Sequence, residues 1–108
     1  MITDANGPIK FAAISETTAA SNEIVAAVTG KRIRILGIVL SAADAVTATI
    51  EDEDGNDLIG PLDITADAPI VLPVSGIGYQ QTPATKALHL LLGGAVAVGG
   101  CITYQEIN

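Results

Sequence analysis

The side chains best suited to binding a ligand lie in an acidic stretch at residues 52–57. A hard cation such as Ca²⁺ needs several oxygen ligands from one tight loop. On the EF-hand pattern, Asp52, Asp54 and Asn56 fall at the first, third and fifth ligand positions. The sixth position, where that loop needs glycine, is Asp57, and no flanking helices are expected. These three residues are the best metal candidates, but a solvated hairpin turn is the preferred interpretation, and we expect no metal and no cofactor.

The chain offers few groups for catalysis. His89 is its only histidine, and alternation places it on the face opposite Leu88 and Leu90, so we interpret it as a packed or rim residue rather than a general base. The members of a Ser-His-Asp set need only meet in space, but no serine here stands in a nucleophile-elbow context. We therefore expect no enzymatic activity, and a small hydrolase that uses His89 is the least favoured function.

Charge and hydropathy narrow the range of partners. Twelve acidic and five basic residues leave a net charge of −7, which opposes nucleic-acid binding because that requires a basic face. The basic cluster at residues 31–34 is interpreted as a solvated rim. Hydrophobic residues make up 49% of the chain and the mean hydropathy is +0.49, which is high for a small protein with a polar surface. We expect part of this apolar surface to be buried between subunits, since exposed apolar patches usually mark interfaces.

Short apolar runs separated by turn signals predict strands along the whole chain. A spacing of about ten to twelve residues is typical of a sandwich or barrel. We expect an all-β fold, an antiparallel β-sandwich of jelly-roll type with about eight strands. It forms one domain over residues 8–108, preceded at residues 1–7 by an arm that is ordered only when a partner holds it. The predicted strands are 9–14, 24–28, 31–41, 45–50, 58–59 with 62–64, 70–74, 79–82, 87–92 and 96–107.

The segment 31–41 is the longest of these strands. Strict alternation places Leu36, Ile38 and Leu40 on the same face as two arginines, so this face starts charged and ends apolar. We expect the strand to be exposed to solvent at its start and buried at its end.

The limb 58–64 returns from an Asp-Gly turn, which is a strong hairpin signal. Gly60-Pro61 interrupts this limb. Because proline cannot donate to a sheet ladder, the limb is expected to be an edge strand or to contain a bulge.

Neither a membrane segment nor an export signal is expected. The N-terminal residues carry Asp4 and no basic region, and no long apolar run follows them. Residues 87–105 lack formal charges but include four glycines and a turn signal, so two strands and a loop explain them better than a membrane helix. Cys101 is the single cysteine and cannot form an internal disulfide, so the fold needs no oxidising compartment.

Several segments carry a family resemblance: residues 30–42, the strand 45–50, "GPLDI" at 60–64, "IVLPVSGIGY" at 70–79 and "LHLLLGGAVAVGGCITYQEI" at 88–107. Together they resemble small structural proteins encoded in tailed-phage and prophage genomes, some of which are β-sandwich capsid decoration, cement or head-fibre proteins. The resemblance covers about residues 8–107 and consists of strand and turn patterns without a functional motif. It implies a homo-oligomer, often a homotrimer, that stands on the major capsid protein of a virion assembled in the host cytoplasm.

We therefore expect a bacteriophage structural protein that decorates or cements the capsid by binding major capsid protein as an oligomer. The alternative is a receptor- or glycan-binding module of a phage tail or fibre. No nucleic-acid or membrane partner is expected. The interface is predicted from apolar residues that alternation does not assign to the core, with the N-terminal region 2–11 meeting the capsid and the apolar end of strand 31–41 at a subunit contact. These residues are Ile2, Ile9, Phe11, Leu36, Ile38 and Leu40.

Overall fold

The computed structural model describes residues 6–108, and this part of the chain contains nine strands and no helix. Accordingly, no helix in it is long and apolar enough to cross a membrane. All paired strands run antiparallel. The strands are β1 (Asn6–Glu16), β2 (Ser21–Val25), β3 (Arg32–Ala42), β4 (Val46–Asp52), β5 (Asp57–Ile64), β6 (Ile70–Leu72), β7 (Gln80–Gln81), β8 (Leu88–Leu92) and β9 (Val98–Ile107).

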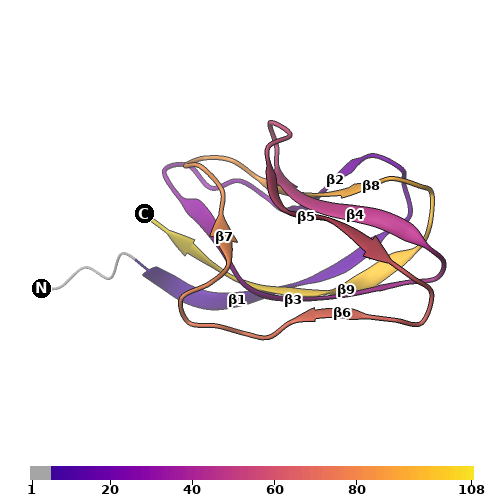
Figure 1. Ribbon diagram of the computed structural model, residues 1–108. Coiled ribbons are helices and arrows are strands. Elements are labelled where there is room, and N and C mark those ends of the chain that lie inside the picture. Colours follow the sequence, from indigo (N-terminus) through magenta and orange to yellow (C-terminus); the bar gives the residue numbers. More distant parts are fainter. Residues whose placement is uncertain (1–5) are drawn as a thin grey trace, which may run out of the picture.

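The strands form two sheets that lie one above the other (Figure 1). One sheet has the order β1-β9-β3-β6, with β7 also pairing with β3, and the other has the order β2-β8-β4-β5. Two interleaved Greek keys of this kind make a jelly roll. The expected all-β antiparallel sandwich of jelly-roll type is therefore confirmed.

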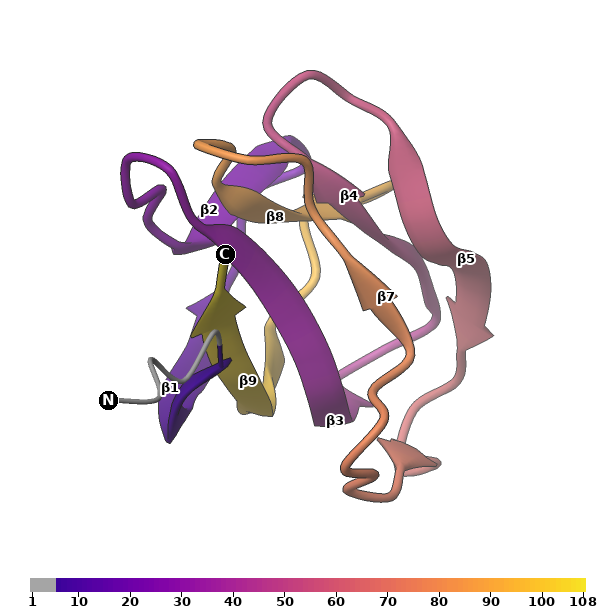
Figure 2. The same ribbon diagram turned by 90° about the vertical axis from the view of Figure 1, so that its left-hand side faces the viewer.

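The count of nine strands instead of eight comes from the outer edge of β3. β6 pairs with residues 38–40 of that edge, and β7 pairs with residues 34–35 of the same edge. The two short strands thus share one position of the jelly roll, and Figure 2 shows β7 on the side of the sandwich between β3 and β5.

The core lies between the two sheets and is filled by aliphatic side chains. No aromatic ring is among the largest fully buried side chains of the described residues. Tyr104 only packs against the core from a half-buried position. Fully buried aliphatic residues come from both sheets: Ile33, Ile35, Leu36, Leu40, Ile50, Ile64, Leu88, Leu90, Leu92, Val98 and Ile102.

Part-way along its length, β3 changes the face that it turns to the core. Its register against β9 shifts between Ile35 and Gly37, and both Ile35 and Leu36 are buried. One extra residue in a strand moves every later side chain to the opposite face. Beyond this bulge Ile38 points inward and Val39 outward. The strict alternation predicted for residues 31–41 is therefore wrong as a description of the whole strand.

Gly60-Pro61 has both of the predicted effects. β5 is an edge strand of its sheet, and its register against β4 shifts around Ile50. Gly60 has a φ of 108°, and a Cβ there would lie 3.1 Å from the carbonyl oxygen of Ala48, so only glycine suits this position.

Most strand boundaries differ from the prediction by one or two residues, and those of β1 and β2 differ most. β2 begins at Ser21 instead of residue 24, because the Asn22 side chain caps the preceding turn by donating hydrogen bonds of 3.0 Å to the carbonyl oxygens of Thr18 and Ala20. β1 begins at Asn6, two residues before the predicted start of the domain.

Candidate functional site

The outer face of the β1-β9-β3-β6 sheet is made of small and apolar side chains. Strand register places Ala13, Cys101, Val39 and Val71 side by side in one row across all four strands. The neighbouring row contains Phe11, Thr103 and Gly37. We call the exposed part of this surface the apolar face, and it comprises Ile9, Phe11, Ala13, Val39, Val71, Val74 and Cys101. Gly37 and Thr103 lie in its middle but are buried, and the row of Ile9 continues through Gln105 to the charged Arg34.

Large side chains on the apolar face are open to solvent. Phe11 is 72% exposed, Val74 64%, Ile9 54%, Val71 54% and Val39 37%. Burying such side chains contributes roughly 1.5–3 kcal/mol each. Within the residues that the structure describes, the surface has the composition of an interface that lacks its partner.

A hollow of about 230 Å³ lies on the apolar face above β3. It is lined by Val39 and Val71 on one side, by Val74 above, and by Cys101 and Thr103 of β9. Gly37 lies in its wall and is buried, because Val74 and the Leu72 carbonyl oxygen lie 3.1 Å from the place of a Cβ at that position. The segment that follows β6 therefore packs directly on the β3 backbone at the bulge.

The predicted interface residues separate into three groups. Ile2 lies outside the described residues. Ile9 and Phe11 are exposed on the apolar face, in the edge strand β1. Leu36, Ile38 and Leu40 are only 1%, 2% and 0% exposed.

The prediction that the end of strand 31–41 meets another subunit through Leu36, Ile38 and Leu40 is therefore wrong. Ile38 and Leu40 belong to the core cluster between the sheets, because the bulge reverses the alternation of β3. Leu36 lies at the bulge itself and is also buried within the chain. The residue of this stretch that is exposed is Val39, and Gly37 is covered by Leu72 and Val74. A glycine in the middle of an apolar strand is a signal for a bulge, and Gly37 is the residue that could have revealed this.

On the outer face of the other sheet, Ser21, Glu51 and His89 form a hydrogen-bonded group. The Ser21 hydroxyl donates to Glu51 Oε1 at 2.6 Å, and Ser21 Oγ lies 2.8 Å from His89 Nδ1. A catalytic triad needs the histidine between the serine and the acid, so that the ring can take the hydroxyl proton. Here the serine stands between the other two, and its hydroxyl donates a hydrogen bond to the carboxylate. The group therefore joins three strands and is not arranged as a triad.

The acidic hairpin turn binds its own backbone. The Asp52 carboxylate accepts hydrogen bonds from the backbone amides of Asp54 (2.9 Å) and Asn56 (3.0 Å), and from the Asn56 side chain. Burial alone raises the pKa of Asp52, but these hydrogen bonds outweigh it and hold the pKa below its ordinary value. Asp54 bonds to Lys86 and raises the pKa of that lysine. Over residues 6–108, no group of three or more His, Cys, Asp and Glu side chains is placed to hold a metal ion.

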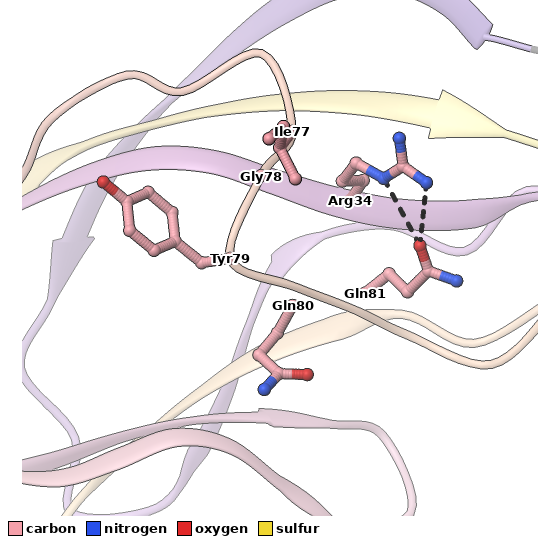
Figure 3. Close-up of a pocket in the computed structure, with 6 residues that line it drawn as sticks. All are labelled: Arg34, Ile77, Gly78, Tyr79, Gln80 and Gln81. Atoms are coloured by element: carbon pink, nitrogen blue, oxygen red, sulfur yellow. Dashed lines mark hydrogen bonds between the residues drawn. The ribbon is translucent and has the colours of Figure 1, made fainter.

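An open pocket of about 280 Å³ lies at the other end of β3 (Figure 3). Arg34 donates hydrogen bonds to Gln81 Oε1 from Nε at 3.3 Å and from a terminal nitrogen at 3.2 Å. The Tyr79 ring points away from this pair, and Gln80 points to the other side of the strand. The polar groups therefore do not converge on one point.

Comparison with known proteins adds no relative. A scan against protein-family models gives no match, and searches of curated proteins and of solved structures give none either. Jelly rolls occur both in viral capsid proteins and in lectins, so the fold alone does not select a function. Surface features must therefore indicate the function, and the apolar face is the most distinctive feature of the described surface.

Proposed function

We propose that this chain is a structural protein of a tailed-phage virion that decorates or cements the capsid, binding major capsid protein as a homo-oligomer. The apolar face is the observation that supports a role in binding and assembly, because it keeps large aliphatic and aromatic side chains in solvent. The choice of a capsid as the target comes from the resemblance of the strand and turn segments to phage structural proteins. Such a protein joins the virion in the host cytoplasm.

A cement protein needs more than one contact surface. It strengthens a shell by holding two or more neighbouring subunits at once, so that each contact raises the effective concentration of the next. A small rigid sandwich suits this role because few groups lose conformational freedom when it docks.

The free edge of β1 supports a capsid contact in the N-terminal region. β1 pairs with β9 on one side, and among the described strands none pairs with its other side. From Ile9 to Glu16 the register is regular, so the edge presents a run of unpaired backbone groups to which another strand could add. The exposed Ile9 lies next to this edge.

Sedimentation with empty capsids of the virus that encodes the chain tests the proposal. The wild-type protein is expected to pellet with the capsids to a saturating ratio, and a chain without residues 1–7 to stay in the supernatant. The shortened chain must still show the circular dichroism of a β-sandwich. Wild-type protein that does not pellet would refute the capsid role, and unchanged binding of the shortened chain would refute a contact through residues 1–7.

The alternative, a receptor- or glycan-binding module of a tail or fibre, has one supporting feature, the pocket beside Arg34 and Gln81. Guanidinium and amide groups suit sugar hydroxyls, although the Tyr79 ring does not face them. Antibody labelling of virions separates the two functions, because decoration places the label on heads and the alternative places it on tails.

A further inference from the structure

The edges of the two sheets differ in how well they are protected against pairing with another strand. Proteins protect sheet edges by keeping the strands short and by placing prolines, bulges and charges there. β2 has five residues and a register shift between Glu23 and Val25, and β5 is interrupted at Gly60-Pro61. β6 and β7, which share an edge, have three and two residues, and β6 lies between Pro69 and Pro73. These edges are therefore poorly suited to adding a strand.

The edge of β1 is long and regular. β1 lies at the margin of its sheet, next to β9 (Figure 2). Its irregularity is confined to the segment before Ile9, which contains Pro8. From Ile9 to Glu16 the register against β9 is unbroken, and this stretch contains no proline and only two charged residues, Lys10 and Glu16. Among the edges of the described strands, β1 is the one to which a further strand is expected to add.

The two charged residues select one antiparallel pairing of β1 with its own copy. Facing residues of an antiparallel pair have their backbone groups in the same orientation, so a strand pairs with its copy about a residue and not between two residues. Lys10 and Glu16 lie three positions on either side of Ala13. Pairing about Ala13 therefore places Lys10 of each copy directly opposite Glu16 of the other, and this contact occurs twice.

The uncharged side chains fit the same register. Phe11 lies opposite Ser15 of the other copy, Ala12 lies opposite Ile14, and Ala13 lies opposite its own counterpart. Each large side chain thus has a small one across from it, so neither face of the joined strands is overcrowded.

The neighbouring registers match the sequence less well. Pairing about Ala12 brings Pro8, which has no N–H to donate, into the ladder. Pairing about Ile14 moves Lys10 beyond the end of the other strand. Of these three registers, pairing about Ala13 alone pairs the whole regular stretch from Lys10 onward and matches both charges.

Lys10 is able to bind a second carboxylate. Its side chain is 45% exposed and forms an ion pair with Glu106 of its own chain. An ammonium group has three N–H donors, so Glu16 of the other copy can share it. Exposed ion pairs contribute little free energy, so we expect them to select the register. The attraction comes from about six to eight backbone hydrogen bonds between the two strands.

We infer that the occupant of the β1 edge is β1 of a second copy, paired antiparallel about Ala13, so that two sheets join into one across a two-fold axis. This names the self-contact of the proposed homo-oligomer, and it rests on that proposal only for its biological setting. It gives a dimer, in contrast to the homotrimer that the phage resemblance implies. The pairing does not use the region before Lys10, which leaves that region for the capsid.

Light scattering in solution, without capsids, tests the assembly. At about 10–100 μM the mass is expected to be twice the chain mass of 10.9 kDa. A contact of one edge with itself is closed after two copies. A monomer at about 100 μM or a trimer would therefore overturn the inference.

Engineered cysteines test the register. Cys101→Ala first removes the thiol that lies opposite Ala13 on β9. In that background Ala13→Cys is expected to give a disulfide-linked dimer on mild oxidation, because facing Cα atoms are about 4.5–5.5 Å apart. Ser15→Cys is the control, since Ser15 is exposed like Ala13 but the two Ser15 residues are offset by about 13 Å along the strands. Equal crosslinking of the two variants, or none in Ala13→Cys, would overturn the pairing.

Charge variants test the Lys10–Glu16 contact. Glu16→Lys places two lysines opposite each other at both ends of the paired stretch, so the dissociation constant is expected to rise at least about 10-fold. Asp57→Lys is the control, because it makes the same change in net charge at an exposed position on β5. This control is expected to dimerise at least as well as wild type.

The double variant Lys10→Glu, Glu16→Lys exchanges the two charges and is expected to restore the dissociation constant to within about threefold of wild type. The loss of the Lys10–Glu106 pair affects monomer and dimer alike. An unaffected dimer in folded Glu16→Lys, or no recovery in the folded double variant, would overturn the inference.

Because no capsid is present, failure of the dimer leaves the capsid proposal standing. A dimer that forms normally but does not pellet with capsids contradicts only the capsid proposal.

Discussion

Gly100 decides whether β9 can lie beside β3. It has a φ of 150°, and a Cβ there would lie 1.8 Å from the carbonyl oxygen of Val39. At the neighbouring Gly99 the nearest contact of a Cβ would be an ordinary 3.6 Å from the Ile14 carbonyl oxygen. Two adjacent glycines on one strand therefore have different roles, and only one of them is required by the fold.

We predict that Gly100→Ala lowers the free energy of unfolding by at least about 2 kcal/mol, because backbone strain and overpacking add to each other. Gly99→Ala is expected to change it by less than about 1 kcal/mol. Urea denaturation of the two variants measures both values. Equal effects of the two substitutions would contradict this account of the β3–β9 contact.

Asp52 makes the stability of the acidic turn depend on pH. Its folded-state pKa lies below its ordinary value, so it stabilises the folded protein when the pH is above the unfolded-state value of about 3.9. That contribution is lost as the pH falls through the lower folded-state pKa.

We predict that Asp52→Asn lowers the free energy of unfolding by about 1–3 kcal/mol at pH 7. The difference from wild type should shrink as the pH falls below about 4. Asp57→Asn serves as the control, because Asp57 is exposed and its side chain makes no hydrogen bond in the described part of the chain. Urea midpoints between pH 7 and pH 2 test this, and a difference that stays constant over the range would argue against it.

At the scale of the element, the bulge in β3 has the largest consequences. It buries two consecutive side chains, Ile35 and Leu36, and turns Val39 to the outer surface. One irregular step in a strand thus decides both which side chains of β3 reach the core and which meet solvent.

We predict that Ile35→Ala and Leu36→Ala each lower the free energy of unfolding by about 2–5 kcal/mol, because both leave a cavity in the core. In a regular strand one of these two side chains would point to solvent, and its truncation would lower the free energy of unfolding only slightly. Val28→Ala, at a 41% exposed position, is the control and should cost less than about 1 kcal/mol. Chemical denaturation of the three variants decides the matter, and a small effect at either Ile35 or Leu36 would rule out the bulge.

The strand ranges could be read from the sequence because alternation and turn residues are local. The Asp-Gly turn and the interruption at Gly60-Pro61 led to a hairpin limb that is both bulged and at an edge, as found. The orientation of residues 36–40 could not be read in the same way. It depends on a register shift against β9, a strand that begins about sixty residues later.

For the whole molecule, self-association links stability to protein concentration. If only the folded chain forms the proposed homo-oligomer, mass action favours folding as the concentration rises. We predict that the wild-type unfolding temperature rises by about 2–4 °C for each tenfold increase in concentration. The Phe11→Asp variant should show no such rise in calorimetry at matched concentrations, and an equal slope for both proteins would count against self-association through the apolar face.

Salt should strengthen the proposed homo-oligomer. Two copies that each carry a net charge of −7 repel, and salt screens this repulsion while leaving apolar contacts in place. We predict that the dissociation constant falls several-fold when the ionic strength rises from about 0.01 M to 0.15 M, where the Debye length shortens from about 30 Å to 8 Å. Sedimentation at the two ionic strengths measures it, and a dimer weakened by salt would point to ion pairs at the interface.

From the sequence alone it follows that this protein is an all-β sandwich with a surplus of apolar surface, because strand periodicity, turn residues and composition are local or additive properties. The tertiary structure alone decided where that surplus lies. Leu36, Ile38 and Leu40 belong to the core, and the exposed surface is built from Phe11, Val39 and other residues of four strands far apart in the chain. The physical reason is register: one extra residue in β3 reverses which side chains meet water, and only its pairing with β9 shows where that residue is.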